Sequence, residues 1–145
     1  MIPDQWYAVL SSGQVRPGKP LGVTRLGEKL VFWRDRQGQV HTLRDSCPHR
    51  GVALSAGKIV GDRIQCPFHG FEYDASGRCT LLPAIGSGAS IPKQFQIQGY
   101  PLYEAHGFIF FTPHAFINIE IKKYIRHRGL PCRDCPDDFP AVKEP

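Results

Sequence analysis

The stretch "CPHRGVALSAGKIVGDRIQCPFHG", residues 47–70, carries two mixed pairs of thiol and imidazole side chains. Cys47 and His49 form a Cys-x-His pair, and Cys66 and His69 form a Cys-x-x-His pair on the other side of sixteen residues. Thiolates and neutral imidazoles are ligands of both zinc and iron. These residue types at these spacings therefore predict a metal centre that two separate segments of the chain share.

Proline and glycine residues give both pairs the same local character. Pro48 and Pro67 directly follow the two cysteines, and a proline ring stiffens the backbone at that point. Gly51 and Gly70 permit turns that bring backbone N–H groups close to an anionic sulfur site. We expect two stiff loop tips that face each other and hold a small group between them.

The sequence around this stretch predicts an all-β fold. From Trp6 to Pro113 the chain is a series of short β-prone runs separated by turn signals, which is typical of a sandwich or barrel. Turn residues between such runs predict bends or hairpins at 35–38, 61–62, 75–77 and 105–107. We expect a larger antiparallel β-sandwich or barrel and a smaller cluster-binding subdomain of two hairpin loops.

A [2Fe–2S] cluster bound through Cys47 and Cys66 at one iron and through His49 and His69 at the other fits this ligand set. With two neutral imidazoles the oxidised cluster has zero net charge, whereas four thiolates would make it negative. The mixed set therefore accepts an electron more easily, at roughly −150 to +300 mV against about −400 mV for plant-type ferredoxins. A structural zinc site, in an interaction module without redox activity, uses the same side chains and stays open as an alternative.

The segments "CPH" at 47–49 and "CPFHG" at 66–70 resemble the Rieske signature. The similarity to the N-terminal Rieske domain of ring-hydroxylating and related Rieske non-haem iron oxygenases extends from "WYAVL" to "YPLYEAHGFIFF". It implies a Rieske [2Fe–2S] domain at residues 1–113, with its cluster-binding part at 44–80. Respiratory Rieske proteins carry an extra cysteine in each loop, where this chain has Val52 and Phe68. The resemblance therefore favours the oxygenase or soluble ferredoxin branch.

The same resemblance implies one-electron transfer from a flavin reductase or ferredoxin to the oxygen-activating iron site of an oxygenase. Such oxygenases hold a mononuclear iron with an Asp-x-x-His motif and a second histidine, a spacing that this sequence lacks. We therefore expect a truncated or partial oxygenase component, an electron-transfer part of an oxidoreductase without catalytic residues of its own. As part of an oxygenase it would belong to a homotrimer. A free-standing Rieske-type ferredoxin is the alternative.

Composition limits the remaining classes of protein. The chain has 145 residues, a formal charge of +5 and no apolar run long enough to span a bilayer, and its start lacks the features of a secretory signal. We expect a cytoplasmic protein that binds neither membrane nor nucleic acid, because no basic run is interleaved with aromatic residues. Residues 114–145 are interpreted as a C-terminal tail, the remnant of a missing catalytic domain, in which Cys132 and Cys135 are unpaired thiols.

One substitution within the signature bears on the reduction potential. Rieske proteins of high potential place a hydroxyl directly after the glycine of the second loop, whereas Phe71 follows Gly70 here. Fewer hydrogen-bond donors to sulfur disfavour the more negative, reduced state. The sequence therefore predicts a potential in the lower part of the Rieske range.

Overall fold

The computed structural model describes residues 6–86 and 90–112. Within these residues the regular elements are β-strands and 3-10 turns of three residues each. The 3-10 turns are η1 (Ser12–Gln14), η2 (Leu54–Ala56), η3 (Pro83–Ile85) and η4 (Lys93–Phe95). The prediction of an all-β fold is confirmed. The interpretation of residues 114–145, including Cys132 and Cys135, lies outside the described residues.

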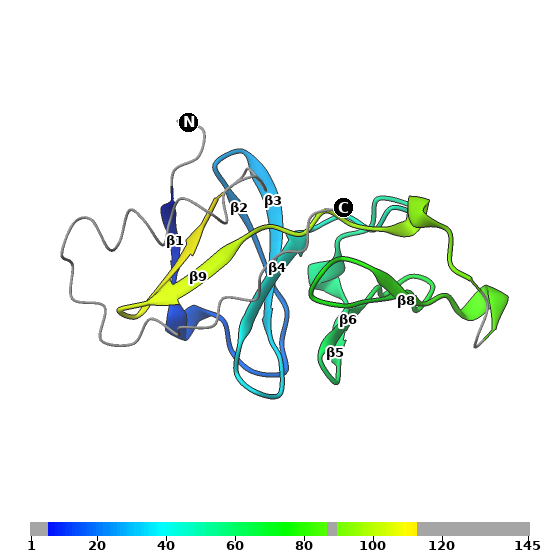
Figure 1. The fold of residues 1–145 in the computed structure, drawn as a ribbon, viewed down its shortest axis with the longest axis horizontal. Helices are drawn as coiled ribbons and strands as arrows, with labels where there is room; N and C mark the ends of the chain where they lie inside the picture. Colours follow the sequence, from blue (N-terminus) through cyan, green and yellow to red (C-terminus); the bar gives the residue numbers. More distant parts are fainter. Residues whose placement is uncertain (1–5, 87–89, 113–145) are drawn as a thin grey trace.

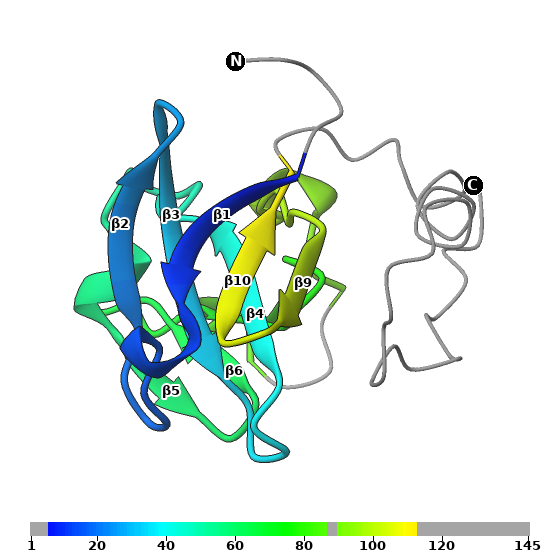
Figure 2. The ribbon, with the colours of Figure 1, turned by 90° about the vertical axis from the view of Figure 1, so that its left-hand side faces the viewer.

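Two three-stranded antiparallel sheets form the base of the molecule (Figures 1 and 2). The first has the order β1-β10-β9, from β1 (Tyr7–Ser11), β10 (Phe108–Phe111) and β9 (Leu102–Ala105). The second has the order β2-β3-β4, from β2 (Leu21–Arg25), β3 (Glu28–Arg34) and β4 (Val40–Arg44). Between them lies one apolar core, whose buried members are Val9, Leu10, Val15, Leu30, Phe32, Val40, Ile109 and Phe111.

A four-stranded antiparallel sheet forms the smaller subdomain at the other end of the molecule (Figure 1). Its order is β5-β6-β7-β8, and its strands are β5 (Lys58–Val60), β6 (Arg63–Gln65), β7 (Glu72–Tyr73) and β8 (Cys79–Leu81). The predicted turn at 61–62 joins β5 to β6, and the predicted turn at 75–77 joins β7 to β8. The expected division into a larger base and a smaller subdomain is confirmed.

The middle of strand β3 connects the base to the subdomain because it is buried on both faces. Leu30 and Phe32 point into the core of the base, whereas Val31 and Trp33 point into a second core that includes Leu54, Ile64 and Tyr73 of the subdomain. These four side chains in the middle of β3 are 0% exposed. A strand without a solvent face has an unbroken apolar run, which the "LVFW" sequence shows.

Strand β2 was not predicted from the sequence. Its second residue is Gly22, and glycine is depleted in strands because it packs no side chain. A side chain at this position would collide with Ser55 of η2, whose hydroxyl donates to Asp45 at 2.6 Å. Gly22 thus weakens the strand signal in the sequence, and its lack of a side chain lets β2 pass close to the start of the subdomain.

A single guanidinium group joins both sheets of the base. Arg34 at the end of β3 donates to Glu104 of β9 through both terminal nitrogens, at 2.7 and 3.0 Å. Its remaining three N–H groups donate to the carbonyl oxygens of Ser12, Val15 and Gly38 at 2.6–2.9 Å. Every donor that arginine possesses is therefore used. The hydrogen bonds from Arg34 hold the pKa of Glu104 below its usual value.

We expect the Glu104→Gln variant to be less stable than the parent protein at neutral pH, by about 1–2 kcal/mol. Because the folded-state pKa of Glu104 is depressed, the contribution of its charge is present above the unfolded value, about 4.3, and is lost as pH falls through the folded value. The stability gap should therefore narrow below about pH 4. Urea unfolding, followed by Trp33 fluorescence at several pH values, measures this gap.

The matched control is Glu28→Gln, because Glu28 lies 3.9 Å from a more exposed arginine, Arg44. It should change stability by less than about 0.5 kcal/mol. Equal effects of the two variants at neutral pH would contradict the role assigned to the Arg34 pair.

A second prediction concerns the turn between β2 and β3, where Leu26 and Gly27 have φ angles of 53° and 84°. Two successive positive φ values are typical of a type I′ turn, which prefers Asn-Gly, and leucine is strained there. We expect Leu26→Asn to stabilise the fold by about 1 kcal/mol, measured as a shift of the urea midpoint. His106, with φ 52°, is the control site, and His106→Asn should gain less since histidine tolerates this conformation better. A loss of stability in Leu26→Asn would refute this assignment of strain.

Candidate metal centre

Two loops of the same sequence pattern, Cys-Pro-x-x-Gly, carry the four candidate ligands. The first loop, 47–51, leaves β4 for the subdomain, and the second, 66–70, closes the β6–β7 hairpin. In the first loop the N–H of Gly51 donates to the carbonyl of Cys47 at 2.7 Å, and the N–H of Cys47 donates to Val52 at 2.8 Å. The first loop is therefore a connection between sheets, and only the second lies within a hairpin.

The second loop repeats this hydrogen-bond pattern. The N–H of Gly70 donates to the carbonyl of Cys66 at 3.2 Å, and the N–H of Cys66 donates to Phe71 at 2.8 Å. Gly51 and Gly70 both have positive φ, 69° and 73°, which glycine adopts without strain. The expectation of two stiff, similar loop tips is met. Histidine occupies the third position of the first loop and the fourth of the second, and Arg50 and Phe68 take the complementary places.

The two cysteines form the buried side of the site. Cys47 is 2% exposed and Cys66 is 3% exposed. Burial raises the pKa of the Cys66 thiol, and the neighbouring Cys47 raises it further. Two thiolates placed side by side in this setting need a positive charge between them, which a metal ion supplies. The donors therefore fit a metal bound by two thiolates.

A tyrosine hydroxyl reaches one of the sulfur atoms. The Tyr73 oxygen lies 3.3 Å from Cys47 Sγ, and the Tyr73 ring is 0% exposed. Burial and the nearby cysteines raise the pKa of Tyr73, so the hydroxyl keeps its proton. The prediction of a low reduction potential considered hydrogen-bond donors only at the position of Phe71. It did not include the hydroxyl of Tyr73, which lies two residues further along the chain. Phe71 and Tyr73 are two residues apart, a spacing that places both side chains on the same face of an extended segment, and both lie in the core that includes the cysteines.

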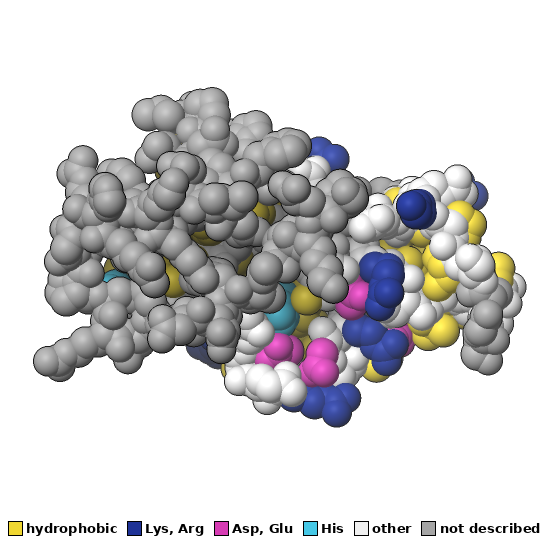
Figure 3. Space-filling view, in the orientation of Figure 1, with side chains coloured by type: hydrophobic (Ala, Val, Ile, Leu, Met, Phe, Trp, Pro, Cys, Tyr) yellow, Lys and Arg dark blue, Asp and Glu magenta, His cyan; other side chains and the backbone are white. Residues whose placement is uncertain are grey.

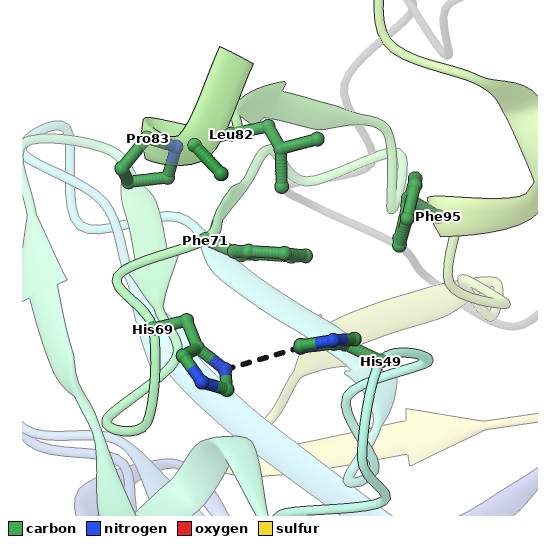
Figure 4. Close-up of a pocket in the computed structure, with 7 residues that line it drawn as sticks. His49, His69, Phe71, Leu82, Pro83 and Phe95 are labelled. Carbon is green, nitrogen blue, oxygen red and sulfur yellow. Dashed lines mark hydrogen bonds between the residues drawn. The ribbon is translucent and has the colours of Figure 1, made fainter. Parts of the chain in front are cut away.

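The two histidines form the exposed side of the site (Figure 4). Their Nδ1 atoms face each other at 3.1 Å. The ring of Phe71 stacks on His49 at 5.2 Å between centroids and 12° between planes, and Phe95 contacts Phe71 edge-on at 5.6 Å. The stacked ring of Phe71 holds the His49 imidazole in place, and the adjacent ring of Phe68 supports the His69 imidazole.

An open pocket of about 550 Å³ adjoins the imidazoles (Figure 4). Its wall is apolar apart from the two histidines, and it is lined by His49, His69, Phe71, Leu82, Pro83, Ala84 and Phe95. The site therefore has soft sulfur donors inside the fold and nitrogen donors at the surface. A group of two metal ions would meet a different ligand type at each end.

Cys79, His41 and His106, the other cysteine and histidines of the described residues, lie outside the paired loops. Cys79 is buried in β8, and its thiol lies 3.4 Å from the Leu81 carbonyl oxygen. His41 lies 2.8 Å from an Asp35 carboxylate oxygen and packs against Trp33. His106 occupies the predicted turn at 105–107. Among residues 6–86 and 90–112, no group of three or more His, Cys, Asp or Glu side chains is arranged around a single metal ion.

An all-β fold with thiols and imidazoles gathered on paired loops defines a class of metal-binding β-sheet protein. A sequence model of the Rieske [2Fe-2S] domain matches residues 5–101 of the chain. The chain belongs to the Rieske [2Fe–2S] domain family, as the resemblance implied, and the cofactor of this domain is a Rieske-type [2Fe–2S] cluster.

The relatives include several larger oxidoreductases. The chain is 33% identical to oxidoreductase NdmD of Pseudomonas putida over 75% of its own length and 18% of that protein. It is 32% identical to 4beta-methylsterol monooxygenase of Methylococcus capsulatus, over 78% of its own length and 31% of that protein. A crystal structure of dicamba monooxygenase superposes with a TM-score of 0.72 at 32% identity, over 79% of this chain and 34% of the other. The chain thus spans about a third or less of the length of these proteins.

No helix in the described part of the chain is long and apolar enough to cross a bilayer.

Replacing Tyr73 with Phe removes the hydroxyl near Cys47 Sγ and keeps the buried ring. A hydrogen bond to sulfur stabilises the reduced, more negative cluster more than the oxidised one. We therefore expect the reduction potential to fall by about 40 mV, which corresponds to roughly 1 kcal/mol in a one-electron couple. Redox titration followed by visible absorption measures the change.

Tyr100→Phe is the control, since its hydroxyl lies 3.3 Å from Glu28 in the base. Its potential should match that of the parent protein. An unchanged potential in Tyr73→Phe with an intact cluster would show that the hydroxyl does not act on the sulfur.

Proposed function

We propose that this chain transfers single electrons through a [2Fe–2S] cluster bound by Cys47 and Cys66 at one iron and by His49 and His69 at the other. The observation that carries this proposal is the arrangement of the four side chains. Two repeated loops place both thiols inside the fold and both imidazoles at its surface. We place the functional domain at residues 1–113 and the cluster-binding part at 44–80.

The bound cluster would supply one-electron redox chemistry, and the surrounding residues determine where the electron passes. Cys47 and Cys66 are closed off from solvent by the core that contains Trp33, Leu54 and Tyr73. His49 and His69 are exposed and border the open pocket. The shortest route between cluster and solvent therefore leads through the imidazole side, where a redox partner can approach.

The donor and the acceptor are proposed from the relatives. Two of them are named as a monooxygenase and as the oxygenase subunit of 3-chlorobenzoate-3,4-dioxygenase. We propose that this chain acts as the Rieske component of an oxygenase, accepts electrons from a flavin reductase or ferredoxin, and passes them to an oxygen-activating iron site in a homotrimer. That iron site lies either in further residues of the same polypeptide or in a separate protein. A reducing compartment such as the cytoplasm suits the free thiols of Cys47, Cys66 and Cys79.

The test is the metal content of protein purified anaerobically without chelators. We expect two iron ions and two acid-labile sulfides per chain, visible absorption, and an electron spin signal after dithionite reduction, because a mixed-ligand cluster accepts one electron. Cys47→Ser should lose the cluster, and Cys79→Ser, a matched change at a buried thiol outside the paired loops, should keep it. One zinc ion per chain, without colour or spin signal, would instead establish the structural zinc site.

A further inference from the structure

One exposed apolar side chain lies beside His69, and another lies in η3, next to residues that line the pocket. Phe68, between Pro67 and His69, is 59% exposed, and its ring centroid lies 4.0 Å from that of His69. Ile85 at the end of η3 is 42% exposed. These two are among the four large hydrophobic side chains that the described residues expose, and Figure 3 shows hydrophobic surface at this end of the molecule. Exposed apolar surface in one place is typical of a contact site.

The same end of the molecule is positively charged. The two ligand loops and the segments 82–86 and 90–95, which adjoin the pocket, contain no Asp or Glu. They contain two exposed cations: Arg50 follows His49, and Lys93 lies in η4, whose Phe95 lines the pocket. Lys58 lies beside the second loop and lines a smaller pocket with Cys66 and Pro67. The imidazoles therefore lie among unbalanced positive charges.

None of the carboxylates of the described residues forms an ion pair with these cations. Asp45 accepts hydrogen bonds from Ser55, and the other six contact an arginine or a histidine: Glu28, Asp35, Asp62, Glu72, Asp74 and Glu104. In contrast, Arg50, Lys58 and Lys93 have no ion-pair partner within residues 6–86 and 90–112. Figure 3 shows the carboxylates of one face toward the middle of the molecule, next to Lys and Arg side chains. The charge at the histidine end is thus available to a partner.

We infer that the surface around His49 and His69 is the docking site for an acidic redox protein. Phe68 and Ile85 provide its apolar centre, and Arg50, Lys58 and Lys93 provide a cationic rim. This inference rests on the proposed electron-transfer function and adds the charge and polarity of the partner. The complementary pattern on the partner is a carboxylate rim around an apolar patch near its own redox centre.

The two parts of the docking site have different physical roles. Opposite charges raise the association rate and orient the encounter, and salt screens this effect. The apolar centre excludes water between the two redox groups and stabilises the docked complex. Arg50 and Phe68 occupy the complementary places of the two repeated loops, so each ligand loop contributes one histidine and one docking side chain.

The test uses two one-electron donors of opposite charge. A plant-type ferredoxin with net negative charge, at about −400 mV, reduces a Rieske cluster downhill: the ferredoxin loses one electron, the cluster gains it, and no proton or atom is transferred. The methyl viologen radical cation is the positively charged small-molecule donor. Stopped-flow absorbance measures the rate of reduction of the reconstituted full chain by each donor, at about 0.02 M and about 0.5 M salt.

The test variant is the double charge reversal Arg50→Glu with Lys93→Glu. Its matched control is Arg16→Glu with Lys29→Glu, because both residues are exposed and belong to the base. Each reversal changes the charge by two, so both double variants lower the formal charge from +5 to +1. A general effect of net charge would be equal in the two variants, whereas a local docking effect would not.

We expect the test variant to be reduced by the ferredoxin about tenfold or more slowly at low salt, and the difference to shrink at high salt. The control variant should change this rate by less than about threefold, because its charges lie outside the docking surface. Reduction by the viologen radical should not slow in either variant. Ile85→Ser, at the apolar centre but outside the ligand loops, should weaken saturation by the ferredoxin without slowing the viologen reaction.

Two outcomes overturn the inference while leaving the proposed function intact: equal ferredoxin rates in the two double variants, or a rate that does not depend on salt. Binding of the oxidised protein to anionic lipid vesicles that is lost only in the test variant would assign the patch to a membrane surface instead. Absence of a reducible cluster in the parent protein would be a failure of the proposed function itself.

Discussion

The site depends on the pair of hydrogen bonds that closes each Cys-Pro-x-x-Gly loop. In both loops the cysteine carbonyl accepts from the glycine N–H four residues later, and the cysteine N–H donates five residues ahead. These bonds fix the direction in which each sulfur points before any metal is present. The glycines satisfy them at positive φ, where other residues would be strained. Two loops built to one pattern can therefore present their ligands to a shared group from opposite sides.

The loops need a firm support, and strand β3 provides it. Its central side chains alternate between the core of the base and the core beneath the cysteines, so the subdomain packs against a strand of the base. The segment that returns from the subdomain adds a second connection, because Ile97 N–H donates to the Gly77 carbonyl at 2.8 Å and Arg44 N–H donates to Gln98 at 3.0 Å. Motion of the subdomain relative to the base would disrupt the core that Val31 and Trp33 share with it.

Much of the fold and of the candidate site could be predicted from local sequence patterns. Turns at Gly61 and Gly77 and the apolar run in β3 are local signals, and the paired Cys-Pro motifs identify the loops directly. Strand β2 was not predicted because the glycine at position 22 is explained by a tertiary contact with Ser55, which a local sequence pattern does not show. The contact of Tyr73 with Cys47 was not predicted for a similar reason, because the two residues are far apart in the sequence. The same holds for Arg50, Lys58 and Lys93, which come from separate parts of the sequence.

The complementary placement of histidine in the two loops has a consequence for substitutions in these loops. Each loop has one interior position tied to the ligand set and a neighbouring position, Arg50 or Phe68, that faces outward. Substitutions at the outward positions leave the loop hydrogen bonds untouched, because these involve backbone atoms alone. A substitution at Arg50 or Phe68 can therefore change the exposed surface of a loop while the backbone hydrogen bonds that shape the loop are kept.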